Sequence, residues 1–321
     1  FKKIFICKFL SVIIFYFIIS NVIYMEELFN KCNICPRECN VNRNKGEIGY
    51  CGASNKIKIG GYHLHMWEEP IITGKNGSGT IFFSYCNLRC IYCQNYDISI
   101  NNNGTEISIE RFSDICLLLQ EMGAENINLV TPSHYIPLIR EGLIMAKRKG
   151  LIIPIVYNTS GYDKVSSLKL LDGLVDIYLP DFKYYDKELN KYSNVNNYFE
   201  ITREALKEMY RQVGKPVIKK GIMKRGVIVR HLVLPSHIDD SKRVIKYLFD
   251  NYGNNIYLSI MNQYTPIRRC KYLELNNTVS EEEYDEIIDY AYDLGVRKCF
   301  VQDKESQEES FIPVFKGDSV I

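Results

Sequence analysis

Residues 79–93 read GTIFFSYCNLRCIYC, a short β-rich run that leads directly into Cys86, Cys90 and Cys93. Three thiolates spaced C-x3-C-x2-C on one loop can hold three irons of a [4Fe–4S] cluster, whereas ordinary ferredoxin clusters are held by four cysteines. Three ligands leave the fourth iron open to a substrate or cofactor, much as a catalytic zinc site keeps a vacant position. The spacing therefore predicts a cluster that takes part in chemistry.

The alternative for the same cysteines is a zinc knuckle or a chance grouping of buried thiols. Zinc usually takes four ligands, commonly from paired C-x2-4-C motifs, and this loop offers three. The loop also follows a predicted strand, and α/β barrels place their chemistry at the carboxyl ends of strands. We therefore favour the cluster.

Strand-like and helix-like segments alternate along the rest of the chain. The predicted strands are 79–86, 126–131, 152–158, 175–180, 227–234, 256–262 and 296–302. The predicted helices are 109–122, 134–149, 164–171, 199–213, 240–251 and 280–294. Such alternation indicates parallel βα units. Six or seven units predict an α/β fold with a partial (β/α)6-type TIM barrel, preceded by an N-terminal cysteine-rich metal-binding extension.

The pattern divides the chain into an apolar segment 1–24, a cysteine-rich lead-in 25–75 and the barrel 76–321. The apolar segment is short for a transmembrane helix, which needs about 20 apolar residues. It begins with basic residues but has no small-x-small cleavage site typical of a signal peptide. The first methionine is Met25. We expect the natural protein to start there, or segment 1–24 to be a membrane anchor, with export least favoured.

Composition excludes several classes of protein. The chain is 46% hydrophobic and 24% charged, near the averages of soluble globular proteins and unlike disordered, collagen-like or disulfide-knot sequences. Its net charge of +2 provides no strong field for nucleic acid or an acidic membrane surface. The 11 cysteines fall largely at metal-ligand spacing, which suits a reducing cytosol better than an oxidising compartment. We expect a cytoplasmic protein that does not bind nucleic acid.

A second cysteine cluster precedes the first along the chain. Cys32, Cys35, Cys39 and Cys51 are spaced C-x2-C-x3-C-x11-C. Four thiolates suit structural zinc and a second iron–sulfur cluster equally well. An iron–sulfur cluster there could relay electrons to the first site, whereas zinc would staple a lead-in that has little apolar core of its own.

The three-cysteine motif, with an aromatic residue before its last cysteine, resembles the signature of radical S-adenosylmethionine (SAM) enzymes. The resemblance runs from about residue 26 to the end of the chain. Longer strings are similar to the PflX-type branch, whose members are described as related to pyruvate formate-lyase activating enzymes. These strings are GTIFFSYCNLRCIYCQN, INLVTPSHY, YNTSGY, LPDFKY, VRHLVLP and SIMNQYTP.

The resemblance implies reductive cleavage of SAM at a [4Fe–4S] cluster, giving methionine and a 5′-deoxyadenosyl radical that abstracts a hydrogen atom from the substrate. It further implies an electron donor such as flavodoxin or ferredoxin and, by analogy with activating enzymes, a glycine of a partner protein as substrate. The alternatives are radical modification of another peptide or small molecule, a non-catalytic iron–sulfur electron-transfer or scaffold protein, and a zinc-stapled binding module.

The same resemblance carries over individual cofactor contacts. Activating enzymes have a GGE-like motif that contacts the SAM amino group. Thr131-Pro132-Ser133-His134 stands here instead, so Thr131 or backbone carbonyls would serve. The other contacts match family motifs at strand ends. They are Asn158, Thr159, Asp181, Lys183 and Arg230.

These side chains also have ordinary structural interpretations. Lys183 and Arg230 could be ion-pair partners within a barrel, and Thr159 could cap a helix. His134 and Tyr264 both follow predicted strand ends and are the candidate catalytic side chains. For segment 63–70, between the two cysteine clusters, packing or surface roles are expected.

Overall fold

The β-rich run ahead of the three cysteines forms strand β2 (Ser78–Phe83) within a sheet of ten strands. The computed structural model describes residues 27–302. The strands are hydrogen-bonded in the order β10-β9-β8-β6-β5-β4-β2-β1-β3, with β7 paired to β8, so the sheet stays open. The other strands are β1 (Ile57–His65), β3 (Thr105–Ile107), β4 (Ile127–Val130), β5 (Ile155–Thr159), β6 (Ile177–Pro180), β7 (Val217–Lys219), β8 (Ile222–Leu232), β9 (Tyr257–Met261) and β10 (Cys299–Val301).

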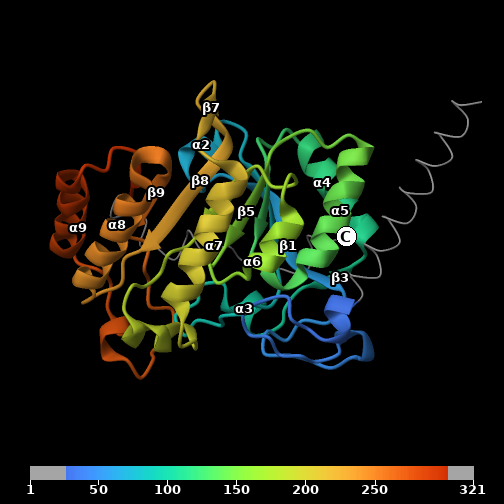
Figure 1. The fold of residues 1–321 in the computed structure, drawn as a ribbon, viewed down its shortest axis with the longest axis horizontal. Helices are drawn as coiled ribbons and strands as arrows, with labels where there is room; N and C mark the ends of the chain where they lie inside the picture. The colour runs from blue at the N-terminus through green and yellow to red at the C-terminus, as the bar shows by residue number, and fades with distance from the viewer. Residues whose placement is uncertain (1–26, 303–321) are drawn as a thin grey trace, which may run out of the picture.

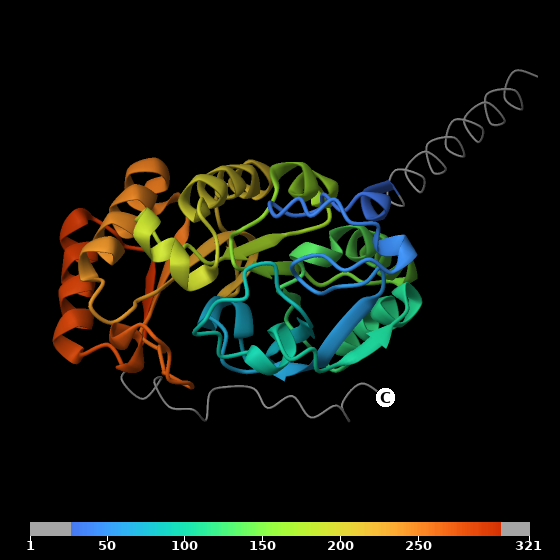
Figure 2. The same ribbon diagram turned by 90° about the horizontal axis from the view of Figure 1, so that it is seen from below.

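Helices follow the strands in sequence and surround them in an arc (Figures 1 and 2). The α-helices are α2 (Pro70–Thr73), α3 (Tyr96–Ser99), α4 (Ile109–Glu121), α5 (Ile136–Lys149), α6 (Val165–Leu168), α7 (Tyr198–Val213), α8 (Ile238–Tyr252) and α9 (Glu281–Leu294). The short 3-10 turns are η1 (Arg43–Lys45), η2 (Ser133–Tyr135), η3 (Lys169–Leu171), η4 (Lys187–Ser193), η5 (Gly253–Asn255) and η6 (Leu273–Asn276).

Local sequence signals set several helix ends. The Ser108 side chain accepts a hydrogen bond from the Arg111 backbone N–H at the start of α4. Ser280 and Glu283 form a capping box at the start of α9. Such caps satisfy backbone donors that have no partner within the helix. Helix α5 ends before Gly150, whose φ of 112° is in the left-handed region that glycine adopts without a Cβ clash.

Seven strands run parallel to one another, namely β2, β4, β5, β6, β8, β9 and β10. The remaining strands pair in antiparallel fashion, namely β1, β3 and β7. In the register Val130 pairs with Asn158 and Thr159 with Pro180, while Asp181 forms an isolated bridge with Arg230. Because the carboxyl ends of parallel strands meet at one edge of a sheet, the loops after these strands come together.

The sheet has an apolar layer on each face. On β5, Ile155 and Tyr157 belong to the main core with the covering helices, whereas Val156 lies in a second cluster with Ile177 and Ile72. This alternation follows from the two-residue period of a strand. Ile72 comes from α2, which packs against β8, so the segment after β1 covers the inner face of the sheet.

The structure confirms the predicted partial barrel. Every predicted strand and helix overlaps an observed element of the same kind. Strands β1, β3 and β7 were not predicted. Strand β1 pairs with β2, so the sheet begins at Ile57, inside the range predicted as the lead-in.

In the span from residue 27 to residue 302, no helix has the length and apolar character needed to cross a membrane. The apolar segment 1–24 lies outside the described residues, so its predicted roles stay predictions.

Candidate active site

The loop after β2 carries three thiols at the sheet edge. Cys86 and Cys90 are buried and Cys93 is half-buried. The Leu88 backbone N–H donates to Cys86 Sγ at 3.4 Å, Cys90 Sγ lies 2.9 Å from Ser193 Oγ, and Cys93 Sγ lies 3.3 Å from Ser99 Oγ. Hydrogen bonds of this kind stabilise a thiolate. Each sulfur therefore has a polar neighbour suited to metal ligation.

Burial raises the pKa of the Cys86 thiol to about 11, with the neighbouring Cys90 adding to the effect. The free thiols are therefore protonated near neutral pH, and a metal centre must displace these protons when it binds. Tyr85 and Arg89, with φ of 73° and 55°, place this loop in the left-handed region, where non-glycine residues are strained.

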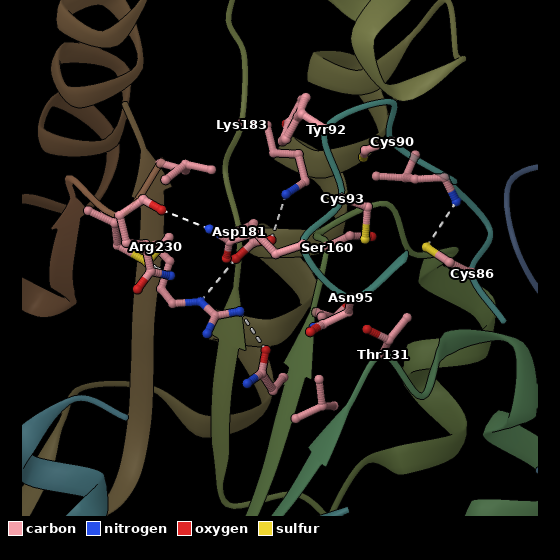
Figure 3. Close-up of a pocket in the computed structure, with 18 of the residues that line it drawn as sticks. Cys86, Cys90, Tyr92, Cys93, Asn95, Thr131, Ser160, Asp181, Lys183 and Arg230 are labelled. Atoms are coloured by element: carbon pink, nitrogen blue, oxygen red, sulfur yellow. Dashed lines mark hydrogen bonds and ion pairs between the residues drawn. The ribbon is translucent and has the colours of Figure 1, made fainter. Parts of the chain in front are cut away.

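The three cysteines open onto a cavity of about 380 Å³ (Figure 3). All six side chains predicted to contact SAM also line it, although they come from four different strands and the residues that follow them. They are Thr131, Asn158, Thr159, Asp181, Lys183 and Arg230. Further lining residues outside the predicted set are His65, Trp67, Glu68, Phe82, Leu88, Tyr92, Gln94, Asn95, Val130, Ser160, Leu232, Met261, Gln263 and Gln302.

A charged network forms one wall of the cavity. Asp181 Oδ2 accepts a hydrogen bond from Lys183 Nζ at 2.7 Å, and Asp181 Oδ1 accepts one from Arg230 Nε at 3.0 Å (Figure 3). Arg230 Nη2 donates to Asn158 Oδ1 at 2.6 Å, and Arg230 Nη1 lies 3.6 Å from Glu68 Oε2. Lys183 and Arg230 are therefore ion-pair partners of Asp181, and both also line the cavity.

These charges reinforce one another because they are largely withdrawn from water. Asp181, Lys183 and Arg230 expose 16%, 11% and 17% of their side chains. Burial alone would raise the pKa of Asp181, but Lys183 and Arg230 outweigh it and hold that pKa below its ordinary value. Burial likewise disfavours the charged form of Lys183, yet Asp181 raises its pKa above the ordinary range. All three groups are charged near neutral pH.

Thr131 and Ser160 line the same cavity. Thr131 has a φ of 59° and donates its backbone N–H to Asn158 O at 2.8 Å. The Ser160 hydroxyl oxygen is buried and has no hydrogen-bond partner among the described residues. A buried hydroxyl without a partner is costly unless a ligand supplies one. Thr159 differs, because its hydroxyl donates to Asp163 Oδ2 at 2.5 Å.

The two candidate catalytic side chains have different positions. His134 does not line the cavity: it is buried, its Nε2 lies 2.8 Å from Ser84 O, and burial lowers its pKa to about 3. Tyr264 does line the cavity, and its hydroxyl donates to Leu275 O at 2.6 Å. Burial raises the pKa of Tyr264 above its ordinary value.

Glu68 is a charged cavity residue that the sequence did not identify. It follows β1, accepts a hydrogen bond from Asn128 Nδ2 at 2.9 Å and lies beside Arg230. Burial raises its pKa above the ordinary value, although Arg230 opposes this. The neighbouring Glu69 is buried too, and burial raises its pKa to about 7. In the sequence, Glu68 and Glu69 are adjacent acidic residues directly before Pro70. This pattern is equally typical of an exposed turn, so it did not indicate a cavity.

The second cysteine cluster lies outside this cavity. Three of its thiols, Cys32, Cys35 and Cys51, are buried and Cys39 is half-buried. Burial raises the pKa of Cys35 to about 12, and the other three thiols, which lie close by, add to the rise. Over residues 27–302, no three His, Cys, Asp or Glu side chains converge closely enough to hold one metal ion. This applies equally to the Cys86 loop, so it does not distinguish the two sets of cysteines.

Several known proteins are similar to this chain. An uncharacterized protein of Methanocaldococcus jannaschii, MJ0674, is 31% identical over 283 residues, which cover 83% of this chain and 75% of that protein. A radical SAM methyltransferase from Sphaerobacter thermophilus has a TM-score of 0.49 and 15% identity, covering 70% of this chain and 66% of the other. A domain of a pyruvate-formate lyase-activating enzyme from Bacteroides vulgatus has a TM-score of 0.38 and 12% identity. The match covers 53% of this chain and 92% of that domain.

A model of a protein family also matches part of this chain. The Radical SAM superfamily matches residues 80–248, which include the three-cysteine loop and the strands that carry Thr131, Asn158, Asp181 and Arg230. The three-cysteine loop and most of the residues that line the cavity therefore lie within the matched region. The chain belongs to the Radical SAM superfamily.

Proposed function

We propose that this protein reductively cleaves SAM in the cavity beside Cys86, Cys90 and Cys93, and that the resulting radical removes a hydrogen atom from a glycine of a partner protein. The observation that carries the first step is the convergence of these thiols with Asp181 and Lys183 on one cavity. The activase step is supported by the sequence resemblance to activating enzymes, which is an argument by analogy.

The donor set fits the cofactor. Three thiols with polar neighbours suit three irons, and the cavity beside them is large enough to admit a ligand of moderate size. Cys86, Cys90 and Cys93 would hold a [4Fe–4S] cluster, which would supply one electron for reductive cleavage of the sulfonium C–S bond of SAM to methionine and a 5′-deoxyadenosyl radical.

The cationic side chains orient the anionic end of SAM. The Lys183 ammonium has three donors and its bond to Asp181 uses one of them. Arg230 has five donors, of which Nε and Nη2 are directed to Asp181 and Asn158. The remaining donors bind the SAM carboxylate or ribose, while Asp181 keeps both cations in place.

The polar residues at the strand ends complete the binding site. Thr131, or the backbone carbonyls beside it, contacts the SAM amino group in place of the GGE-like motif. The Ser160 hydroxyl, which has no hydrogen-bond partner within residues 27–302, forms a hydrogen bond with the cofactor. The rings of Tyr92 and Tyr264, 5.9 Å apart, reduce access of water to the cavity, and exclusion of water protects a reactive intermediate from side reactions.

The proposal includes two partners and a second metal. A one-electron donor such as flavodoxin or ferredoxin reduces the cluster, and the protein that carries the glycine docks at the cavity. Cys32, Cys35, Cys39 and Cys51 hold zinc or an iron–sulfur cluster. Radical modification of another peptide or small molecule is the second candidate, because the same cavity chemistry serves it equally.

The test is formation of 5′-deoxyadenosine. The protein is purified without oxygen, reconstituted with iron and sulfide, and incubated with reductant and SAM. We expect product from the parent and from Cys116→Ala, which removes a buried thiol of α4 far from the motif. Cys90→Ala should give none. Equal product from Cys90→Ala, or none from a fully loaded parent in the presence of its substrate, would refute the proposal.

A further inference from the structure

The two sets of cysteines are joined by direct contacts between their loops. Arg37 lies between Cys35 and Cys39 in the chain. Its Nε donates to Asn87 O at 2.8 Å. Asn87 in turn lies between Cys86 and Cys90, so one hydrogen bond connects the interiors of both motifs.

Tyr50, the residue before Cys51, makes a second connection. Its hydroxyl donates to Leu88 O at 3.2 Å, and Arg89 Nη1 donates back to Tyr50 O at 3.2 Å. The Arg37 guanidinium lies 3.7 Å from the centre of the Tyr50 ring. Arg37 and Tyr50 therefore act together, because each is positioned by the other as well as by the Cys86 loop.

The Cys86 loop needs such support. Tyr85 and Arg89 adopt left-handed backbone conformations, which are strained for residues other than glycine and persist only where the surrounding structure holds them. Asn87 and Leu88 are fully buried. Without Arg37 and Tyr50, their carbonyl groups would lose partners that bulk water does not replace.

Little regular structure holds Arg37 and Tyr50 in place. Between residues 32 and 51 the described secondary structure is the three-residue turn η1. What this segment does have is hydrogen-bond donors directed at three of its four sulfurs. The backbone N–H groups of Tyr50 and Ala53 point to Cys39 Sγ and Cys51 Sγ, at 3.3 and 3.5 Å, and Arg43 Nη1 lies 3.9 Å from Cys32 Sγ.

The backbone at Gly49 also approaches one of these sulfurs closely. A Cβ on Gly49 would lie 3.0 Å from Cys39 Sγ. Donors directed at sulfur, together with this close backbone approach, are typical of a loop that wraps a thiolate-bound metal.

We infer that Cys32, Cys35, Cys39 and Cys51 hold a thiolate-bound metal centre that positions the Cys86 loop through Arg37 and Tyr50. The chemical class is a thiophilic centre, either zinc or iron–sulfur. The inference rests on the proposed function insofar as the Cys86 loop holds the SAM-binding cluster. Arg37 and Tyr50 are positioning residues, since neither lines the cavity.

Metal binding by the four N-terminal cysteines is tested in a variant that lacks the three cysteines of the Cys86 loop. Cys86, Cys90 and Cys93 are replaced together by alanine, and metals are measured after purification without oxygen and reconstitution. We expect the triple variant to keep about one zinc or about four irons per chain, and additional replacement of Cys35 and Cys51 to remove it. No bound metal in the triple variant would overturn the inference.

The coupling is tested by SAM affinity. In Arg37→Ala the metal on the four N-terminal thiols should stay, while SAM binding to the oxidised, reconstituted protein weakens about tenfold in equilibrium dialysis. The matched control is Arg297→Ala, which removes an arginine that stacks 4.4 Å from the Tyr292 ring and donates to backbone carbonyls elsewhere. It should leave SAM binding unchanged.

A milder variant protects this test against misfolding. Tyr50→Phe keeps the ring and removes only the hydroxyl, and we expect it to weaken SAM binding about threefold. SAM affinity unchanged in both Arg37→Ala and Tyr50→Phe would overturn the coupling. Neither readout needs turnover, so failure of the proposed function, seen as absence of 5′-deoxyadenosine from the parent, is distinguishable from failure of this inference.

Discussion

Arg230 and Asp181 meet across neighbouring parallel strands, with Arg230 Nε 3.0 Å from Asp181 Oδ1. The pair explains how Arg230 stays charged in a largely buried wall of the cavity. Asp181 also binds Lys183, so one carboxylate holds two cations beside the cysteine loop. If the proposed function is right, this arrangement holds the donors of Lys183 and Arg230 in position before SAM binds, which favours tight and oriented binding.

Replacing the shared carboxylate should destabilise the protein strongly. Asp181→Asn leaves Lys183 in a largely buried site without its carboxylate partner and Arg230 with Glu68 as its remaining ion-pair partner. Breaking a buried ion pair in this way costs about 3–5 kcal/mol. Urea unfolding at pH 7 measures the loss. Asp250→Asn is the control, because it breaks a solvent-exposed pair with Lys246, and exposed ion pairs contribute little to stability. If the two variants lost equal stability, the central role of Asp181 would be wrong.

Glu69 should make stability depend on pH. Burial raises its pKa from 4.5 to about 7, so the folded state binds this proton more tightly than the unfolded state does. The contribution of the Glu69 proton to the free energy of unfolding is therefore fully present below pH 4.5 and is lost as pH rises through about 7. Glu69→Gln has no charge to bury and should remove this decline.

Unfolding free energies of the parent and Glu69→Gln at pH 5.5 and 8 provide the comparison. We expect the variant to gain stability relative to the parent at pH 8. Glu141→Gln, at an exposed position on α5, should follow the parent. A Glu69→Gln curve parallel to that of the parent would show that this carboxyl does not titrate in the range.

Ser160→Ala should weaken SAM binding while leaving the free energy of unfolding nearly unchanged. The hydroxyl has no partner among the described residues, so its removal should change the unfolding free energy by no more than about 0.5 kcal/mol. SAM affinity should fall about fivefold, the value of roughly one hydrogen bond.

Ser113→Ala is the control for that change. Its buried hydroxyl on α4 also has no partner in the described part of the chain, but it does not line the cavity. SAM affinity should not change. Unaltered affinity in Ser160→Ala as well would remove Ser160 from the binding site.

His134 should not act as a proton donor or acceptor. Its pKa of about 3 keeps it neutral, and it packs behind the cysteine loop with Nε2 near Ser84 O. His134→Gln should therefore lower stability but keep the pH profile of 5′-deoxyadenosine formation between pH 6 and 8. A lost pH inflection with stability intact would make His134 catalytic after all.

Much of the fold could be predicted because each parallel unit carries its own local signal. Strands β4 and β5 are short apolar runs that end at polar residues, and α4 and α5 have helical periodicity with clear ends. Strand β1 lacked such a signal, since Gly60 and Gly61 interrupt it and its residues mix both faces. Strand β7 has three exposed residues and pairs only with β8, so long-range contact decides it.

The candidate site was predictable to a similar degree. The cysteine spacing is local, whereas Asp181 and Asn158 were predicted from the resemblance to family motifs. The parallel strands bring both of these positions to one edge of the sheet. Glu68 could not be found this way, because it reaches the cavity only through the antiparallel return of β1 beside β2. The same holds for Arg37 and Tyr50, whose contacts join segments about 40–50 positions apart in the chain.

Electron paramagnetic resonance of the reduced, reconstituted protein tests the central claim most directly. If three cysteines leave one iron open toward the cavity, SAM must change the spectrum of the cluster, and the change must be weaker or absent at the same SAM concentration when Lys183→Met removes a proposed cofactor contact. A spectrum of the fully loaded parent that saturating SAM leaves unaltered would contradict the account.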